Sequence, residues 1–394
     1  MSKRDRVAAI GVGYSTTGRR TGLTRRQLVA QAAVAAMKDC GISADQIDGV
    51  VLHAGVAGAE PPGLDRIDAL DVAQMLGMMP ITFYNSDQGG PAYIHAAISA
   101  IAAIQSGQAH TVLTVRVINQ RLSSAQERDS VQGPMLVGGD SQFTMPFGSV
   151  TPIQTISALP AQRHMELYGT TEEQFGAHVI AQRAHAALND DALMRDPLTM
   201  DDYLNSRFVS KPVRLLDCDY PVDSASAIIF TTEERARDFA KKPVFVDSAV
   251  LSATDVLPAG FEKVVDMNHN SPYHAAKELW KRTDLKPSDV DCAQLYDGFT
   301  IIVFQWLEAL GFCGEGEAGP FVESGATRLG GSLPVNTDGG ACNVGRRHGA
   351  NFCIESIRQL RGNESGARQV KDAEVAVWAN ATGPFSGAVL MTSG

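Results

Sequence analysis

Residues 292–300 read Cys-Ala-Gln-Leu-Tyr-Asp-Gly-Phe-Thr, a short apolar run that ends abruptly in polar groups and glycine. This pattern is typical of a buried strand that delivers side chains to the mouth of a site. Residues 336–349, Asn-Thr-Asp-Gly-Gly-Ala-Cys-Asn-Val-Gly-Arg-Arg-His-Gly, form a glycine-rich counterpart. Glycine lets the backbone turn tightly near a ligand, and a following helix directs free N–H groups at that ligand. We therefore predict two strand-to-helix junctions that carry chemistry, with ordinary βα turns as the alternative.

Both junctions resemble segments earlier in the chain. Residues 42–53 match residues 285–296, because each segment has a helix before it, an Asp-bearing turn and a strand after it. Residues 85–90, Asn-Ser-Asp-Gln-Gly-Gly, open a helix that leads to a strand, as residues 336–340 do. The chain therefore looks internally duplicated, with β–α–β units in each half. Such crossovers imply an α/β protein whose sheets are covered by helices on both faces.

The two halves are predicted to be residues 1–242 and residues 243–394. The first half opens with a strand, and Thr24 then starts an amphipathic helix that ends near Gly41. Residues 117–210 have no counterpart in the second half and are interpreted as an insertion or loop region in the first. Insertions of this kind often form walls that face a substrate.

Composition argues against several classes of protein. The net charge is -10 and Lys and Arg do not cluster, so a nucleic-acid-binding surface is not expected. No apolar run reaches the roughly 18 residues that span a bilayer, and no secretory h-region follows the charged N-terminus. We therefore expect no membrane span and a cytoplasmic location. The six cysteines include no CxxC pair, which gives no indication of a metal site or a disulfide framework.

Four motifs, in order along the chain, resemble those of a thiolase-superfamily subunit of the sterol-carrier-protein type. They are His164–Thr170 before a helix, Pro221–Ala227 before a strand, Tyr296–Thr300, and Asn336–Gly349. The resemblance covers essentially the whole chain. It implies a thiolase-like five-layered α-β-α-β-α fold built from two duplicated halves, a dimer as the usual assembly, and acyl-coenzyme A thioesters as substrates.

The chain departs from the thiolases at the residues that carry their nucleophilic chemistry. A thiolase has a cysteine where this chain has Gly90, at a helix N-terminus that lowers the thiol pKa, and no cysteine lies between Cys40 and Cys218. The second thiolase cysteine is missing from the loop at residues 379–387. The histidine expected in the last motif is Arg346, which stays protonated and cannot act as a general base. Claisen condensation through an acyl-enzyme is therefore not expected.

The run Tyr296-Asp297-Gly298-Phe299 is similar to the motif of a branch that lacks both cysteines, the lipid-transfer-protein-like aldolases of steroid side-chain degradation. This resemblance implies a carbon–carbon lyase that cleaves a 3-hydroxyacyl-CoA, such as a steroid side-chain CoA thioester, by retro-aldol chemistry. The implied products are a ketone or aldehyde and a short acyl-CoA. The reaction needs no covalent nucleophile and no cofactor other than the coenzyme A of the substrate.

Retro-aldol cleavage needs a base for the 3-hydroxyl proton, donors for the enolate oxygen and an acid for the carbon. We expect Tyr296 to exchange a proton if a cation, Arg346, lowers its phenol pKa from about 10. His348 is a second candidate proton carrier that titrates near neutral pH. Asp297 is expected to orient the backbone or Arg346. The expected donors to the enolate are backbone N–H groups near Gly89, Gly90 and Gly383.

Arg346 leaves two alternative functions to consider. The aldolase branch has a tyrosine at this position, in a Gly-Tyr-x-His-Gly run, where this chain has Gly-Arg-Arg-His-Gly. A non-catalytic acyl-CoA-binding or lipid-binding subunit of a larger complex would keep the fold and lose the proton carriers. An acyl-CoA acyltransferase with a different nucleophile would need Ser or Thr at Gly90, and neither is there.

Resemblance to the aldolase branch also implies partner proteins. Members of the branch typically work with a small subunit that bears a zinc ribbon and an OB-type barrel. This chain supplies neither part, because no cysteine pair has the spacing of zinc ligands. We expect a homodimer core that pairs through a continuous sheet, with the small subunit docked near residues 117–210.

Overall fold

A nine-stranded mixed sheet runs through the described part of the chain, whose structure is a computed structural model. The structure describes residues 6–54, 67–87, 92–119, 154–239, 241–254, 267 and 269–394. The strand order is β3-β2-β4-β7-β1-β8-β11-β10-β9. The strands are β1 (Val7–Tyr14), β2 (Gly49–Ala54), β3 (Phe83–Asp87), β4 (Thr111–Ile118), β7 (Ser224–Thr232), β8 (Val244–Ala253), β9 (Cys292–Leu295), β10 (Val375–Thr382) and β11 (Phe385–Thr392), with a separate hairpin of β5 (Phe208–Ser210) and β6 (Val213–Arg214).

The strand order repeats on the two sides of the β1–β8 pair. Going outward, β1, β7, β4 and β2 on one side are matched by β8, β11, β10 and β9 on the other. β2 lies parallel to β4, and β9 lies parallel to β10. Where the first half has β3 beside β2, the second has an isolated parallel bridge between Ala293 and Val335. A duplicated chain produces this repetition, and the domain division after residue 242 stays a prediction.

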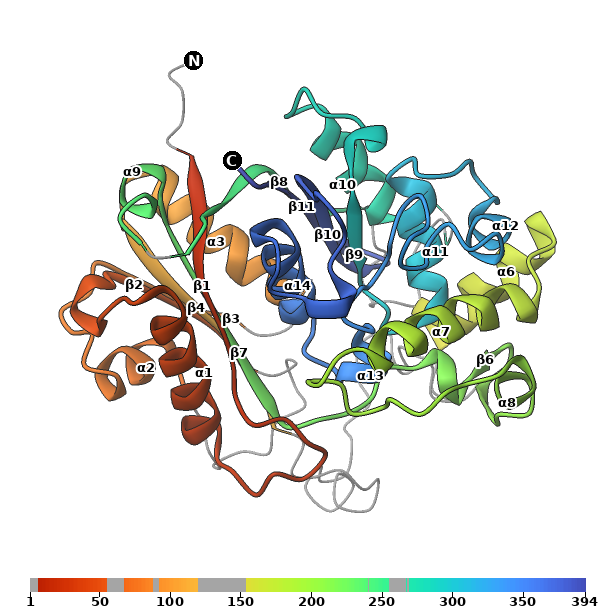
Figure 1. Cartoon of the computed structure of the whole chain (residues 1–394), viewed down its shortest axis with the longest axis horizontal. Coiled ribbons are helices and arrows are strands. Elements are labelled where there is room, and N and C mark those ends of the chain that lie inside the picture. Colours follow the sequence, from red (N-terminus) through yellow and green to blue (C-terminus); the bar gives the residue numbers. More distant parts are fainter. Residues whose placement is uncertain are drawn as a thin grey trace, which may run out of the picture.

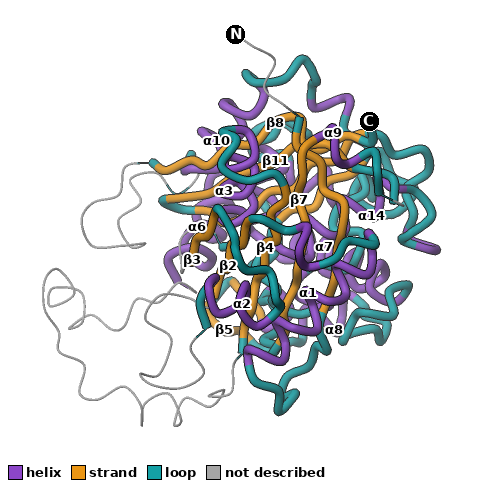
Figure 2. Tube along the Cα trace, turned by 90° about the vertical axis from the view of Figure 1, so that its left-hand side faces the viewer, coloured by secondary structure: helices purple, strands orange, loops and turns teal. Residues whose placement is uncertain are grey.

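Helices cover and separate the two groups of strands, which gives five layers. The middle layer is α3 (Tyr93–Gln105) with α14 (Ala350–Arg361), which pack on strands of both halves in one buried cluster. Figure 1 shows these two helices between the N-terminal and the C-terminal strands. The outer layers are α1 (Arg25–Cys40) with α2 (Ala69–Met75) on the first half, in front of its strands in Figure 2, and α10 (Ser271–Trp280) with α11 (Thr300–Ala309) on the second. This is the predicted α-β-α-β-α arrangement.

The first helix begins and ends at the residues that cap it. The Thr24 hydroxyl accepts a hydrogen bond from the Gln27 N–H at 3.2 Å, and the Gln27 side chain accepts one from the Thr24 N–H at 2.9 Å. Gly41 ends the helix in the left-handed conformation, with φ of 76°, which glycine adopts without strain. The predicted start at Thr24 and end near Gly41 are confirmed.

The described part of the predicted insertion is largely helical, and residues 120–153 lie outside the described residues. Its main element, α7 (Glu172–Ala187), begins after the N-cap Thr171 and hydrogen-bonds the glycine-rich loop at residues 336–349 through two of its side chains. The segment therefore helps to position that loop. The other short helices are α6 (Leu159–Tyr168), α8 (Met200–Leu204), α9 (Glu233–Ala236), α12 (Ala318–Glu323) and α13 (Ala341–Val344).

Candidate active site

The two junctions predicted from the sequence lie side by side. β9 ends at Leu295, and residues 296–299 lead directly into α11. The buried Asn336 side chain joins the junctions: its Oδ1 accepts from the Leu295 N–H at 2.7 Å and its Nδ2 donates to the Leu295 carbonyl at 2.8 Å. This contact fixes Tyr296 beside the glycine-rich loop.

Asp297 is wholly buried against this loop. Its carboxylate accepts hydrogen bonds from the Ala341 N–H at 2.8 Å, the Cys342 N–H at 3.3 Å and the Gln182 side chain at 3.0 Å. A Cβ at Gly340 would come within 2.2 Å of the carboxylate, so this close approach requires glycine. Burial raises the pKa of Asp297 to about 7, although the two backbone N–H groups act in the opposite direction. Asp297 therefore orients the backbone, which is one of its two expected roles.

The carboxylate that binds Arg346 is Asp219, which no sequence motif singled out. Arg346 donates from Nε to Oδ2 at 2.7 Å and from Nη2 to Oδ1 at 2.5 Å, a bidentate pair. The Tyr296 hydroxyl donates to the same Oδ2 at 3.3 Å. The Asp219 side chain is 3% exposed and the Arg346 side chain is 31% exposed, so the pair is open to solvent on one side. The available signal in the sequence was an acidic residue two positions before the Pro221–Ala227 motif.

Tyr296 is a neutral phenol in this setting. Burial, followed by the Asp219 carboxylate, raises its pKa well above the ordinary value of 10, and the Arg346 charge only partly opposes this. Arg346 acts to lower this pKa, as expected, but the pKa of Tyr296 is not lowered below 10, because burial and the Asp219 carboxylate outweigh the guanidinium. Tyr296 therefore keeps its proton at neutral pH.

His348 lies on the same loop in a left-handed backbone conformation, with φ of 47°. Its carbonyl accepts from the N–H of Tyr93, the first residue of α3, at 3.1 Å. Its Nδ1 lies 2.5 Å from Nη2 of Arg116, on β4. Burial, followed by the charges of Arg116 and Arg346, lowers the pKa of His348 well below 6.5. The expectation of titration near neutral pH is wrong, because this imidazole is buried beside cations.

Gly383 is the one residue of the three expected enolate donors that lies within the described residues. It belongs to the turn between β10 and β11, with φ of 73°, and its carbonyl accepts from the Ser271 N–H at 3.1 Å. Gly89 and Gly90 lie outside the described residues. Donation by these backbone groups stays a prediction.

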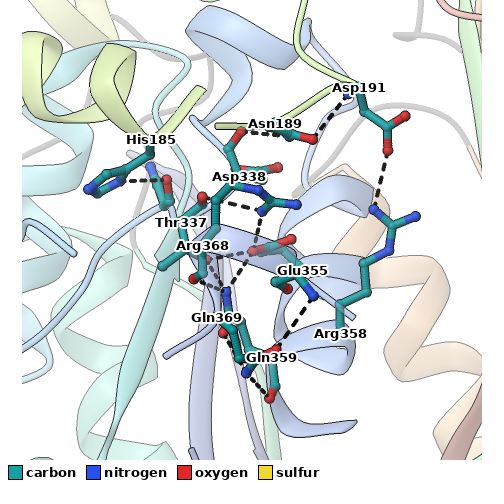
Figure 3. A network of polar contacts seen from close by, with 12 residues as sticks. His185, Asn189, Asp191, Thr337, Asp338, Glu355, Arg358, Gln359, Arg368 and Gln369 are labelled. Carbon is teal, nitrogen blue, oxygen red and sulfur yellow. Dashed lines mark hydrogen bonds and ion pairs between the residues drawn. The ribbon is translucent and has the colours of Figure 1, made fainter. Parts of the chain in front are cut away.

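A buried polar network holds the glycine-rich loop on the side of α14, as Figure 3 shows. Glu355 of α14 accepts from the Thr337 hydroxyl at 2.7 Å and pairs with Arg368 at 2.6 Å. Asn189, which follows α7, donates to the Asp338 carbonyl at 2.8 Å. Because these groups hydrogen-bond one another, the loop has a defined shape.

Within the described ranges, no three or more His, Cys, Asp or Glu side chains gather in a group that could hold a metal ion. The helices described there also lack the combination of length and apolar character that crossing a membrane requires.

The chain is similar to several known proteins over nearly its full length. Residues 259–392 match the family model described as thiolase C-terminal domain-like. The chain is 33% identical over 395 residues to the 17-hydroxy-3-oxo-4-pregnene-20-carboxyl-CoA lyase of Mycobacterium tuberculosis, which covers 98% of each protein. It is 32% identical over 397 residues to the steroid side-chain-cleaving aldolase of Thermomonospora curvata, with 98% of this chain and 97% of the relative covered. A solved Ltp2-ChsH2(DUF35) aldolase is similar with a TM-score of 0.84 and 30% identity, over 99% of this chain and 98% of that chain.

Proposed function

The chain belongs to the thiolase-like family of steroid side-chain-cleaving aldolases, and we propose that it cleaves a 3-hydroxyacyl-CoA by a retro-aldol reaction. The proposed products are a ketone or aldehyde and a shorter acyl-CoA. A steroid side-chain CoA thioester is the proposed substrate class, since one relative is named as a lyase of a pregnene-carboxyl-CoA and another as a steroid side-chain-cleaving aldolase. The observation that carries the proposal is the hydrogen bond from Tyr296 to Asp219, a carboxylate that Arg346 also binds, because this pair provides for proton transfer without a cysteine.

In the proposed mechanism, Tyr296 relays a proton between the substrate and Asp219. The substrate 3-hydroxyl gives its proton to the phenol oxygen while the phenol proton moves to Asp219 Oδ2, 3.3 Å away. The bond between C2 and C3 then breaks, its electron pair forms the thioester enolate, and C3 becomes the carbonyl carbon. The relay needs no free phenolate, which agrees with the raised pKa of Tyr296.

The same relay completes the reaction in reverse. Asp219 returns the proton to Tyr296, and Tyr296 protonates C2 of the enolate, so the enzyme ends in the protonation state in which it began. Arg346 holds Asp219 in place through two charge-assisted hydrogen bonds. Asp297 acts as a positioning residue, because it binds the backbone N–H groups that follow Gly340.

Product analysis with defined CoA thioesters tests the proposal. The purified chain, alone and with its small partner subunit, is incubated with steroid side-chain 3-hydroxyacyl-CoA thioesters, and mass spectrometry quantifies the carbonyl product and the shortened acyl-CoA. The same thioesters without the 3-hydroxyl are the control and should stay intact. Equal amounts of the two products support a retro-aldolase, whereas intact hydroxylated substrates throughout the series would overturn the proposal.

Arg346 favours a second candidate, a non-catalytic subunit that binds acyl-CoA or lipid. Arg346 lies at the position where the aldolase branch has a tyrosine, and its guanidinium is paired with the Asp219 carboxylate. Such a subunit would bind the thioesters in calorimetry and release no carbonyl product.

An acyl-CoA acyltransferase, the third candidate, would instead release free coenzyme A, but the sequence has no cysteine between Cys40 and Cys218 to carry the acyl group.

We also propose a complex of a homodimer core with a small subunit. The similar Ltp2-ChsH2(DUF35) aldolase has two components in its name, which supports a second subunit. The outermost strand β3 carries Tyr84 with 58% exposure, and such a strand edge suits pairing with a second copy. Docking of the small subunit near residues 117–210 stays a prediction. Light scattering of the chain with and without the small subunit measures the mass of the assembly. Full activity of the chain alone, unchanged by the small subunit, would contradict the proposed complex.

A further inference from the structure

An arginine from a distant part of the chain holds the His348 imidazole. Arg116 lies on β4, is 1% exposed, and brings its Nη2 within 2.5 Å of His348 Nδ1. The same guanidinium donates through Nη1 to the carbonyls of His53 and Val117. Hydrogen bonds to β2 and β4 therefore fix the guanidinium that meets the ring.

This contact determines which nitrogen of His348 carries the proton. Arginine stays protonated in proteins, and its guanidinium donates hydrogen bonds and accepts none. Nδ1 must therefore be the acceptor, and the proton of a neutral imidazole then lies on Nε2. A doubly protonated ring would set one N–H against another, and one cation against another, at 2.5 Å.

The charged and titratable groups around the ring agree with this assignment. They are Arg116 from β4, Arg346 from the same loop and His53 from β2, and each adds to the effect of burial in lowering the pKa of His348. Burial lowers the pKa of His53 to about 3, so that ring is neutral as well. The charge of Arg116 thus acts on His348 together with that of Arg346, which Asp219 partly neutralises, and the resulting potential favours an oxygen that gains negative charge.

We propose that Arg116 is a positioning residue that locks His348 as the Nε2–H tautomer, so that His348 donates a hydrogen bond to the substrate thioester oxygen and exchanges no proton. The inference rests on the proposed retro-aldol function, in which this oxygen becomes the enolate oxygen. Within the described residues, Arg116 is the side chain that hydrogen-bonds the ring, and it does so at Nδ1, which leaves Nε2 for a ligand. The bond from the Tyr93 N–H to the His348 carbonyl keeps the residue at the positive end of α3.

Nitrogen NMR of the ¹⁵N-histidine-labelled protein tests the tautomer without any substrate. The chain has nine histidines, and the signals that disappear in His348→Gln identify His348. We expect Nδ1 of His348 to be unprotonated and Nε2 to be protonated, with no change from pH 5.5 to pH 9, a window on either side of the ordinary histidine value of about 6.5. A protonated Nδ1, or a titration of this ring near 6.5, would overturn the inference.

Variants of His348 separate hydrogen-bond donation from proton exchange. His348→Ala removes the donor and should lower kcat by about 10²–10³-fold, the usual loss for one oxyanion donor. His348→Gln keeps an N–H donor and cannot relay a proton between two ring nitrogens, so it should lose much less activity. Equal losses in the two variants contradict a donor role.

Variants of Arg116 separate positioning of the ring from support of the fold. Arg116→Met should let His348 titrate and populate both tautomers, and it should lower kcat more than it raises KM. Arg116→Lys keeps a cationic donor and should therefore preserve the Nε2–H tautomer. Thermal unfolding reports any structural loss, which by itself would leave the tautomer unchanged. If Arg116→Met does not fold, the NMR result for the wild-type chain still decides the assignment. A wild-type chain that has the expected tautomer but cleaves no 3-hydroxyacyl-CoA would count against the proposed function and leave the tautomer assignment standing.

Discussion

Substitution of Asp219 by asparagine tests the proton relay most directly. Oδ2 of Asp219 accepts from Tyr296 at 3.3 Å and from Arg346 Nε at 2.7 Å, and Oδ1 accepts from Arg346 Nη2 at 2.5 Å. The amide has nearly the same shape, but it has lost the charge and turns an N–H group toward one of these donors. If Asp219 takes the phenol proton, we expect Asp219→Asn to lower kcat by about 10²–10⁴-fold, the usual loss for a general acid or base.

The effect on the Tyr296 pKa makes this prediction discriminating. The Asp219 carboxylate raises that pKa and the Arg346 charge lowers it, so Asp219→Asn should lower it. If a tyrosinate did the chemistry by itself, the variant would therefore be as active as the wild type or more active near neutral pH. Ultraviolet difference titration, with Tyr296→Phe as the blank, measures the pKa, and steady-state turnover from pH 6 to pH 9, below the ordinary phenol value of about 10, measures the activity.

The fold should survive the Asp219→Asn change. A hydrogen bond to a charged group contributes about 1.5–3 kcal/mol, and we expect a loss of stability in this range. The larger cost of a fully buried broken ion pair does not apply, because the Arg346 side chain is 31% exposed and water can hydrate the freed cation.

Asp217→Asn is the matched control for this variant. Asp217 is also buried and accepts from a tyrosine hydroxyl, that of Tyr203, at 3.0 Å to each oxygen. It should lose stability and keep most of its turnover, because this tyrosine and carboxylate take no part in the relay. Turnover of Asp219→Asn within a few-fold of the wild type would refute the reasoning.

Further predictions concern the remaining groups of the site. Tyr296→Phe should lower kcat by about 10²–10⁴-fold. The control Tyr273→Phe also removes one tyrosine–carboxylate hydrogen bond, to Glu308 at 3.2 Å, and should keep kcat near the wild-type value. Equal kcat values in the two variants would remove Tyr296 from the mechanism. Arg346→Tyr should fold, because the side chain borders solvent, but lose most activity, since it removes both hydrogen bonds that orient Asp219; a gain in cleavage would mean that the natural residue weakens an aldolase. Burial raises the pKa of Asp297 to about 7 from 3.8, so between these values the folded chain binds a proton that the unfolded chain does not, and this contribution to stability fades as pH rises. The Tm difference between pH 5 and pH 8 should accordingly shrink in Asp297→Asn, and an unchanged difference would show that other groups cause it.

Several elements of this fold could be predicted from the sequence because neighbouring residues encode them. Thr24 and Gly41 bound the first helix through contacts within one turn of each end, and the apolar run before Tyr296 forms β9 as its pattern indicates. The duplicated order of helices and strands likewise reappears in the order of the sheet. Tyr296 and Asp297 could be selected because their motif is continuous in the chain.

The partners of these residues were decided by the tertiary structure. Asp219 is 127 residues from Arg346 along the chain, and Arg116 is 232 residues from His348, so no local pattern links either pair. The pKa shifts depend on the same packing. The sequence alone suggested a lowered pKa for Tyr296 and a near-neutral pKa for His348. Burial and these charged neighbours instead raise the pKa of Tyr296 and lower the pKa of His348 well below neutral. Side-chain identity fixes which groups can exchange a proton, but the depth of burial and the charges brought alongside by the fold determine which of them holds one.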